Sequence, residues 1–170
     1  IYVDGELVAR FDHLEKTVAS NDHSLLIGAE IYPDGPDTIL GRHLDGKIDE
    51  VRIFNTVLTA EGIQSSMNAT LDGTEEGLVG YWKFDSTNTT TAIDRSTAGN
   101  NGTIVGEVTP GETRFHIQTP HQGALFFDGT DDYIDVDSTH ELSISGGAFT
   151  MEAWVYYNGN NPAENTVIDK

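Results

Sequence analysis

One stretch of alternating apolar residues, at positions 43–55, constrains the fold more than any other part of this chain. Ile48, Val51 and Ile53 follow the two-residue period of a β-strand with one buried face. The period slips once, at residues 49–50, which are both acidic. The stretch therefore predicts a strand with an apolar inner face and two acids near its start.

The residues on either side of this strand carry signals of their own. Asp45 and Gly46 predict a turn that leads into the strand. After the strand, Thr59 can cap a short helix that carries Glu61 in its first turn. The sequence thus predicts one short helix after Leu58.

The rest of the chain consists mainly of short runs rich in β-branched and aromatic residues, which favour strands. Such runs occupy positions 1–8, 24–29, 77–85, 103–105, 123–137, 149–157 and 166–170. The first predicts a hairpin around Asp4 and Gly5, because this pair tolerates the positive φ of a tight turn. Residues 30–42 hold two prolines and two glycines and predict an exposed loop. Residues 67–76 are polar and predict a linker or surface crossing.

Composition excludes several classes of function. The chain has 28 acidic and 9 basic residues, a net charge of -19, and such a surface repels nucleic-acid phosphates while suiting divalent cations. It has no cysteine, so disulfides and zinc–cysteine sites are excluded. No apolar run approaches the ~20 residues that a membrane-spanning helix needs, so we expect no membrane span.

Residues 1–66 contain the sequences Y-V-D-G-E-L-V, L-L-I-G-A and G-K-I-D-E-V-R-I-F-N. These motifs resemble the C-terminal half of laminin G-like domains, which belong to the concanavalin A-like lectin/glucanase group. In residues 77–170 the sequences G-L-V-G-Y-W-K-F-D, A-L-F-F-D-G-T-D-D-Y-I-D-V and F-T-M-E-A-W-V resemble the N-terminal half. Residues 67–76 would link the two. The resemblance implies an all-β fold, an antiparallel two-sheet jelly-roll sandwich with one short helix.

The two resembling halves stand in reversed order, and three interpretations stay open. The chain is a window from a tandem array, a circular permutant of one domain, or a filament subunit whose sheets neighbouring chains complete. Cut jelly-roll sheets leave unpaired edges. We therefore expect neighbouring copies of the chain or adjacent repeats as partners.

The apolar faces of these predicted strands define a continuous core. Its expected members are Leu26, Ile48, Val51, Ile53, Trp82, Phe84, Phe126, Ile134, Val136, Phe149 and Trp154.

Acids near the strand ends are candidate ligands for calcium, which prefers six to eight oxygen ligands. The resemblance implies a structural calcium near such positions. The candidates are Asp49, Glu50, Asp85, Asp94, Asp128, Asp131 and Asp132. The competing interpretation is that acids fill every loop of so acidic a chain.

A second candidate site would bind carbohydrate by stacking sugar rings on exposed aromatic residues. Tyr156, Tyr157, Asn158 and Asn160 are available for it, whereas both tryptophans fit core positions better. Catalysis is not expected. The best pair of acids on one face, Asp135 and Asp137, has no apolar surroundings that would raise one pKa.

The sequence thus predicts a non-enzymatic structural or adhesion module, extracellular or at the cell surface. It would belong to a repeat array or filament and carry calcium-stabilised loops. The alternative is a carbohydrate-binding module of a secreted multidomain protein, with glycans as its ligands.

Overall fold

A computed structural model describes residues 1–10, 23–34, 37–111, 123–137, 142, 148–158 and 165–170, which form two five-stranded antiparallel sheets. The first, called the β6 sheet, has the order β10 (Thr109–Gly111), β11 (Ala124–Asp128), β6 (Asp45–Phe54) and β13 (Thr150–Tyr157), with β7 (Leu78–Trp82) also paired to β6. The second, called the β3 sheet, has the order β14 (Ile168–Asp169), β3 (Leu25–Ile27), β12 (Tyr133–Val136), β9 (Gly102–Val105) and β8 (Thr91–Ala92). This confirms the predicted all-β sandwich.

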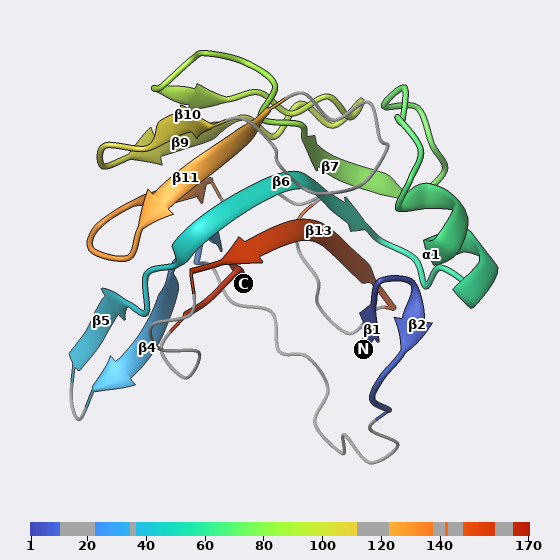
Figure 1. Cartoon of the computed structure of the whole chain (residues 1–170), viewed down its shortest axis with the longest axis horizontal. Coiled ribbons are helices and arrows are strands. Elements are labelled where there is room, and N and C mark those ends of the chain that lie inside the picture. The colour runs from blue at the N-terminus through green and yellow to red at the C-terminus, as the bar shows by residue number, and fades with distance from the viewer. Residues whose placement is uncertain (11–22, 35–36, 112–122, 138–141, 143–147, 159–164) are drawn as a thin grey trace.

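Two hairpins and one helix flank the sheets. The hairpins are β1 (Tyr2–Val3) with β2 (Glu6–Leu7), and β4 (Glu30–Asp34) with β5 (Asp37–Gly41). They project on opposite sides below the curved β6 sheet (Figure 1). Helix α1 (Ala60–Ser66) begins where predicted, since the Thr59 hydroxyl oxygen accepts a hydrogen bond of 3.1 Å from the backbone N–H of Gly62.

Strand β6 holds its sheet together because it pairs with neighbouring strands along both of its edges. One edge pairs first with β11, where Ile48 faces Leu125, and then with β7, where Val51 faces Trp82. The other edge pairs with β13. Strands that precede and strands that follow residues 67–76 therefore lie in the same sheet. The β3 sheet also combines both parts of the chain, because β3 pairs with β12.

The slip in the apolar period of β6 coincides with a β-bulge. Arg52 pairs with Glu152 and Asp49 pairs with Trp154, so three steps on β6 match two steps on β13. Glu50 has a φ of 52°, in the left-handed region that side chains seldom adopt.

The core lies between the two sheets. Its buried members include Leu25 and Ile27 of β3 and Leu125 and Phe127 of β11. The predicted members that lie in it are Ile48, Val51, Ile53, Trp82, Phe84, Ile134 and Val136, and Leu26 is also buried. The predictions for Phe126, Phe149 and Trp154 are wrong, because these side chains are only half-buried. On β11 it is Phe127 that faces the core, and successive residues of a strand face opposite sides.

Two other predictions need correction. Residues 30–42 are not an open loop but contain the β4–β5 hairpin. Asp45 and Gly46 do not form a turn before β6, because they are its first two residues and pair with Asp128 and Phe127. The predicted turn at Asp4 and Gly5 is confirmed by φ angles of 51° and 77°.

Candidate functional site

The turn between β11 and β12 brings three of the predicted calcium ligands together. Carboxylate oxygens of Asp128, Asp131 and Asp132 all lie within 4.8 Å of one another. Asp128 and Asp131 are exposed, whereas Asp132 is 2% exposed. We call this group the acidic loop.

Hydrogen bonds from the backbone fix two of the three carboxylates of the acidic loop. The Asp132 carboxylate accepts one of 3.0 Å from the N–H of Asp128, and the Asp128 carboxylate accepts one of 2.8 Å from the N–H of Thr130. Burial raises the pKa of Asp132, and the nearby charges of Asp128 and Asp131 add to this rise. A bound cation would relieve both effects, so the acidic loop could hold an ion.

The other predicted ligands lie elsewhere. The Asp94 carboxylate accepts four hydrogen bonds of 2.7–2.8 Å, from the backbone N–H groups of Tyr81, Ser96 and Asn100 and from the Ser96 hydroxyl. These donors take up its oxygens, so Asp94 organises the turn that follows β8. Asp85 lies after β7 and forms an ion pair of 2.8 Å with Lys83.

Asp49 and Glu50 are both buried within β6. Burial raises the pKa of Asp49 to about 8, with further contributions from the charges of Glu50 and Asp85. One Asp49 oxygen accepts a 2.8 Å hydrogen bond from the N–H of Glu50. The other, Oδ2, is buried and has no hydrogen-bond partner in the described part of the chain.

Glu50 belongs to a buried ionic group that the sequence did not reveal, which we call the Arg52 cluster. Glu50 and Arg52 form an ion pair of 2.5 Å, and each side chain is 1% exposed. The Tyr81 hydroxyl donates to the same Glu50 oxygen at 2.7 Å. Arg52 also donates to the backbone carbonyls of Ser66 and Ala69, at 2.5 and 2.8 Å. The cluster thus ties β6 and β7 to the segment around the end of α1.

Glu152 of β13 completes the Arg52 cluster. Its carboxylate accepts hydrogen bonds of 2.8 and 3.1 Å from the Ser66 hydroxyl and lies 3.8 Å from the Arg52 guanidinium. Burial raises the pKa of Glu152, because the hydrogen bonds and the Arg52 charge only partly compensate for lost water. The signal in the sequence is weak: Glu50 and Arg52 stand two apart, but Glu152 is a hundred residues away in the chain.

The predicted carbohydrate surface lies at the end of β13. Tyr156 is 53% exposed, while Tyr157 is half-buried and packs against the core. Asn158 is exposed and donates a 2.6 Å hydrogen bond to the Asp45 carboxylate. Asn160 lies outside the described residues.

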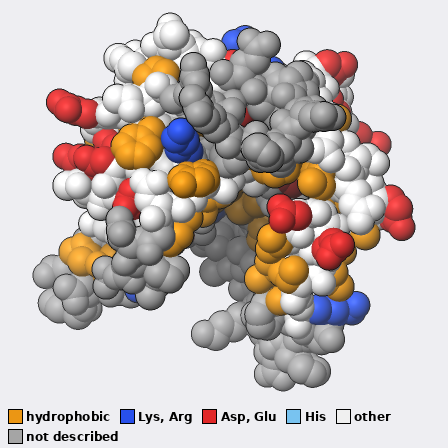
Figure 2. All heavy atoms as spheres, viewed as in Figure 1, with side chains coloured by type: hydrophobic (Ala, Val, Ile, Leu, Met, Phe, Trp, Pro, Cys, Tyr) orange, Lys and Arg blue, Asp and Glu red, His pale blue; other side chains and the backbone are white. Residues whose placement is uncertain are grey.

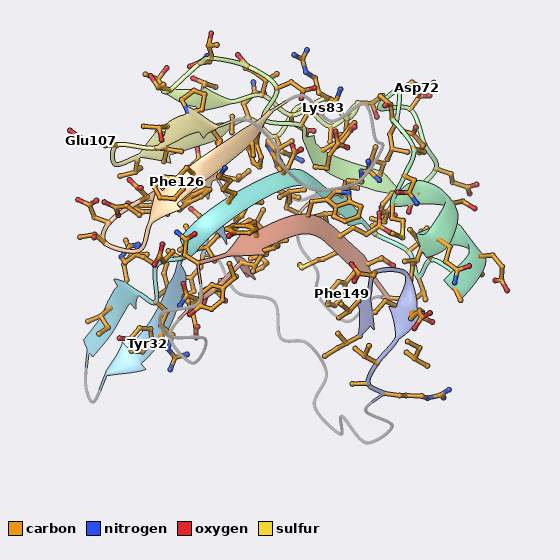
Figure 3. The ribbon with its side chains drawn as sticks, viewed as in Figure 1. Tyr32, Asp72, Lys83, Glu107, Phe126 and Phe149 are labelled. Atoms are coloured by element: carbon orange, nitrogen blue, oxygen red, sulfur yellow. The ribbon has the colours of Figure 1, made fainter. Side chains whose placement is uncertain are left out.

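A groove of about 700 Å³ opens between β13, the β1–β2 hairpin and α1. Its lining is mainly apolar, with Arg52-cluster side chains among it. Figure 3 shows Phe149, at the start of β13, beside β1. We call this the β13 groove.

Comparison with known proteins supports the resemblance for the first part of the chain. A family model described as the concanavalin A-like lectin/glucanases superfamily, Laminin_G_3, matches residues 1–64. This segment is similar to laminin G-like domains. It holds β1 to β6 and most of α1, and so supplies the strand around which the β6 sheet is built. No curated protein and no solved structure matched the chain.

The match bears on function at a coarse level. Laminin G-like domains are generally non-catalytic binding modules, typically extracellular and often able to bind carbohydrate or calcium. In the part of the chain that the structure describes, no helix is long and apolar enough to cross a membrane. The resemblance of residues 77–170 and the reversed order of the two halves stay predictions from the sequence.

Proposed function

We propose that this chain is a non-enzymatic extracellular module with a structural or adhesive role, built into an array or filament of similar modules. The observation that carries the proposal is the clustering of exposed apolar side chains at one end of the molecule. Ile1, Val3, Leu7 and Val8 on and beside the β1–β2 hairpin are 53–66% exposed. Val155, on β13 across the groove, is 38% exposed.

Figure 2 shows hydrophobic side chains gathered beside the hollow on the hairpin side of this face. Contiguous exposed apolar patches commonly mark surfaces that bind other macromolecules. The ionisable side chains with the most unusual surroundings are Asp49, Glu50 and Arg52, and each is at most 1% exposed. This distribution supports contact with partners rather than turnover of a substrate.

The acidic loop would stabilise the module by binding calcium. Its three carboxylates supply the hard oxygen ligands that Ca²⁺ prefers, and backbone hydrogen bonds already hold two of them in place. The ion would neutralise clustered like charges and lock the β11–β12 turn.

Light scattering of the native particle, with and without a calcium chelator, tests the assembly role. Large particles are expected, and their dissociation on chelation would place calcium at the contacts between modules. A folded monomer of about 18.5 kDa at every protein concentration would overturn the proposal.

The second candidate function is carbohydrate binding at the end of β13, favoured by the exposed ring of Tyr156 beside Asn158. A glycan screen with the native chain and the Tyr156→Ala variant tests it. Binding that the variant loses would support a carbohydrate site. Equal binding by both proteins would remove Tyr156 from it.

A further inference from the structure

The β13 groove lies on the face of the β6 sheet that carries Glu50 and Arg52, and it also reaches the edge strand β13. Its wall includes every residue from Phe149 to Val155. Successive residues of a strand point to opposite faces, so a groove confined to one face would touch only alternate residues. Contact with seven consecutive residues places the strand's backbone edge at the groove.

That edge of β13 has no strand beside it in the described residues, because β13 pairs with β6 on its other side and ends the order of the β6 sheet. Natural edge strands are usually protected by lysine, proline or short length. β13 has eight residues, contains neither lysine nor proline, and carries Glu152 as its one charged residue.

The charge within the groove is unbalanced. Glu50, Arg52 and Glu152 all contribute to its lining, so two carboxylates meet one guanidinium. Arg52 is committed to Glu50 at 2.5 Å and is 3.8 Å from Glu152. Asp4 adds a further acid on the hairpin wall. A cation entering the groove would therefore meet an excess of negative charge, because the single guanidinium of Arg52 balances Glu152 only in part.

We propose that the β13 groove binds an extended segment of another polypeptide as an added strand, with apolar residues at alternate positions and a lysine or arginine opposite Glu152. Main-chain hydrogen bonds to the β13 edge would supply affinity, and the apolar walls together with Glu152 would supply selectivity. This inference rests on the proposed adhesive role and names the class of partner.

The test uses a capped nine-residue peptide of alternating valine and threonine with a central lysine, titrated calorimetrically into the native chain. Replacing the lysine by norleucine should weaken binding about ten- to a hundredfold, as expected for a charge-assisted contact. In the Glu152→Gln variant the two peptides should bind equally. Glu107→Gln removes one charge at the end of the molecule remote from Phe149 (Figure 3), and should keep the full preference for lysine.

Peptides methylated on alternate backbone nitrogens test whether the added segment is a strand. Only one of the two alternating sets of N–H groups can face β13, so one methylated isomer should bind and the other should not. Equal binding of both isomers, or an undiminished lysine preference in Glu152→Gln, would overturn the inference.

The outcome is separable from that of the proposed function. Peptide binding by a monomer would support the groove while refuting the array. Stable large particles that do not bind the peptide would support the array and refute peptide binding in the groove.

Discussion

Replacing Arg52 by methionine tests whether the Arg52 cluster holds the sandwich together. The change keeps a long apolar stem but removes the ion pair to Glu50 and the hydrogen bonds to the carbonyls of Ser66 and Ala69. The Glu50 side chain, which is 1% exposed, would then keep the hydrogen bond from the Tyr81 hydroxyl but lose the positive charge of Arg52 that balances its own. Removing one partner of a buried ion pair typically costs ~3–5 kcal/mol of the free energy of unfolding.

That cost is large beside the total of roughly 5–15 kcal/mol expected for a domain, so the midpoint of urea unfolding should fall by ~1 M or more. Tryptophan fluorescence measures the transition. The matched control is Arg42→Met, whose ion pair with Glu30 at 2.9 Å lies at the surface and should contribute ~0–1 kcal/mol.

A double variant sharpens this test. Glu50→Gln combined with Arg52→Met removes both charges, so it should be less destabilised than the sum of the two single variants. The reasoning fails if Arg52→Met unfolds within ~1 kcal/mol of the native chain, or if the two changes simply add.

Three further predictions follow from single residues. Phe127→Ala should cost ~3–5 kcal/mol because the ring is fully buried, and Phe126→Ala should cost clearly less in the same calorimetric unfolding series. Asp49 binds its proton more tightly in the folded protein, where its pKa is about 8, than in the unfolded chain, where it is 3.8. Its contribution to stability is therefore lost as the pH rises from about 4 towards 8. The urea midpoint of the native chain should fall over this pH window, and that of Asp49→Asn should fall less steeply. Calcium should raise the melting temperature of the native chain but not of Asp132→Asn, and an equal rise in both would exclude the acidic loop as the site.

Local patterns in the sequence predicted the parts of the fold that local chemistry determines. The hairpin turn at Asp4 and Gly5 follows from the positive φ that the turn requires, and the start of α1 follows from the Thr59 cap. The two-residue period identified β6 and its core-facing residues. These features depend on neighbours within a few positions.

The missed features depend on residues that are distant in the chain. β8 and β10 have two and three residues, too few to show a period, and exist because β9 and β11 offer them a pairing edge. The Arg52 cluster needs β6, β7, β13 and the end of α1 to meet. The acidic loop was predictable because its three acids lie within five residues of the chain. Only the folded structure shows that these acids lie apart from Asp49 and Asp94.

The bulge at Glu50 links the sequence pattern of β6 to the chemistry of the groove. Ile48 and Val51 both face the core although they stand three apart, and a regular strand would turn one of them outward. The extra residue restores the period and leaves Arg52 on the face opposite the core, where it meets Tyr81 and Glu152. The left-handed backbone at Glu50 costs on the order of 1–3 kcal/mol, which the 2.5 Å contact with Arg52 helps to offset. Because Arg52 is committed to Glu50, Glu152 is left with an incompletely balanced charge, and the same irregularity that completes the core also creates the acidic floor of the β13 groove.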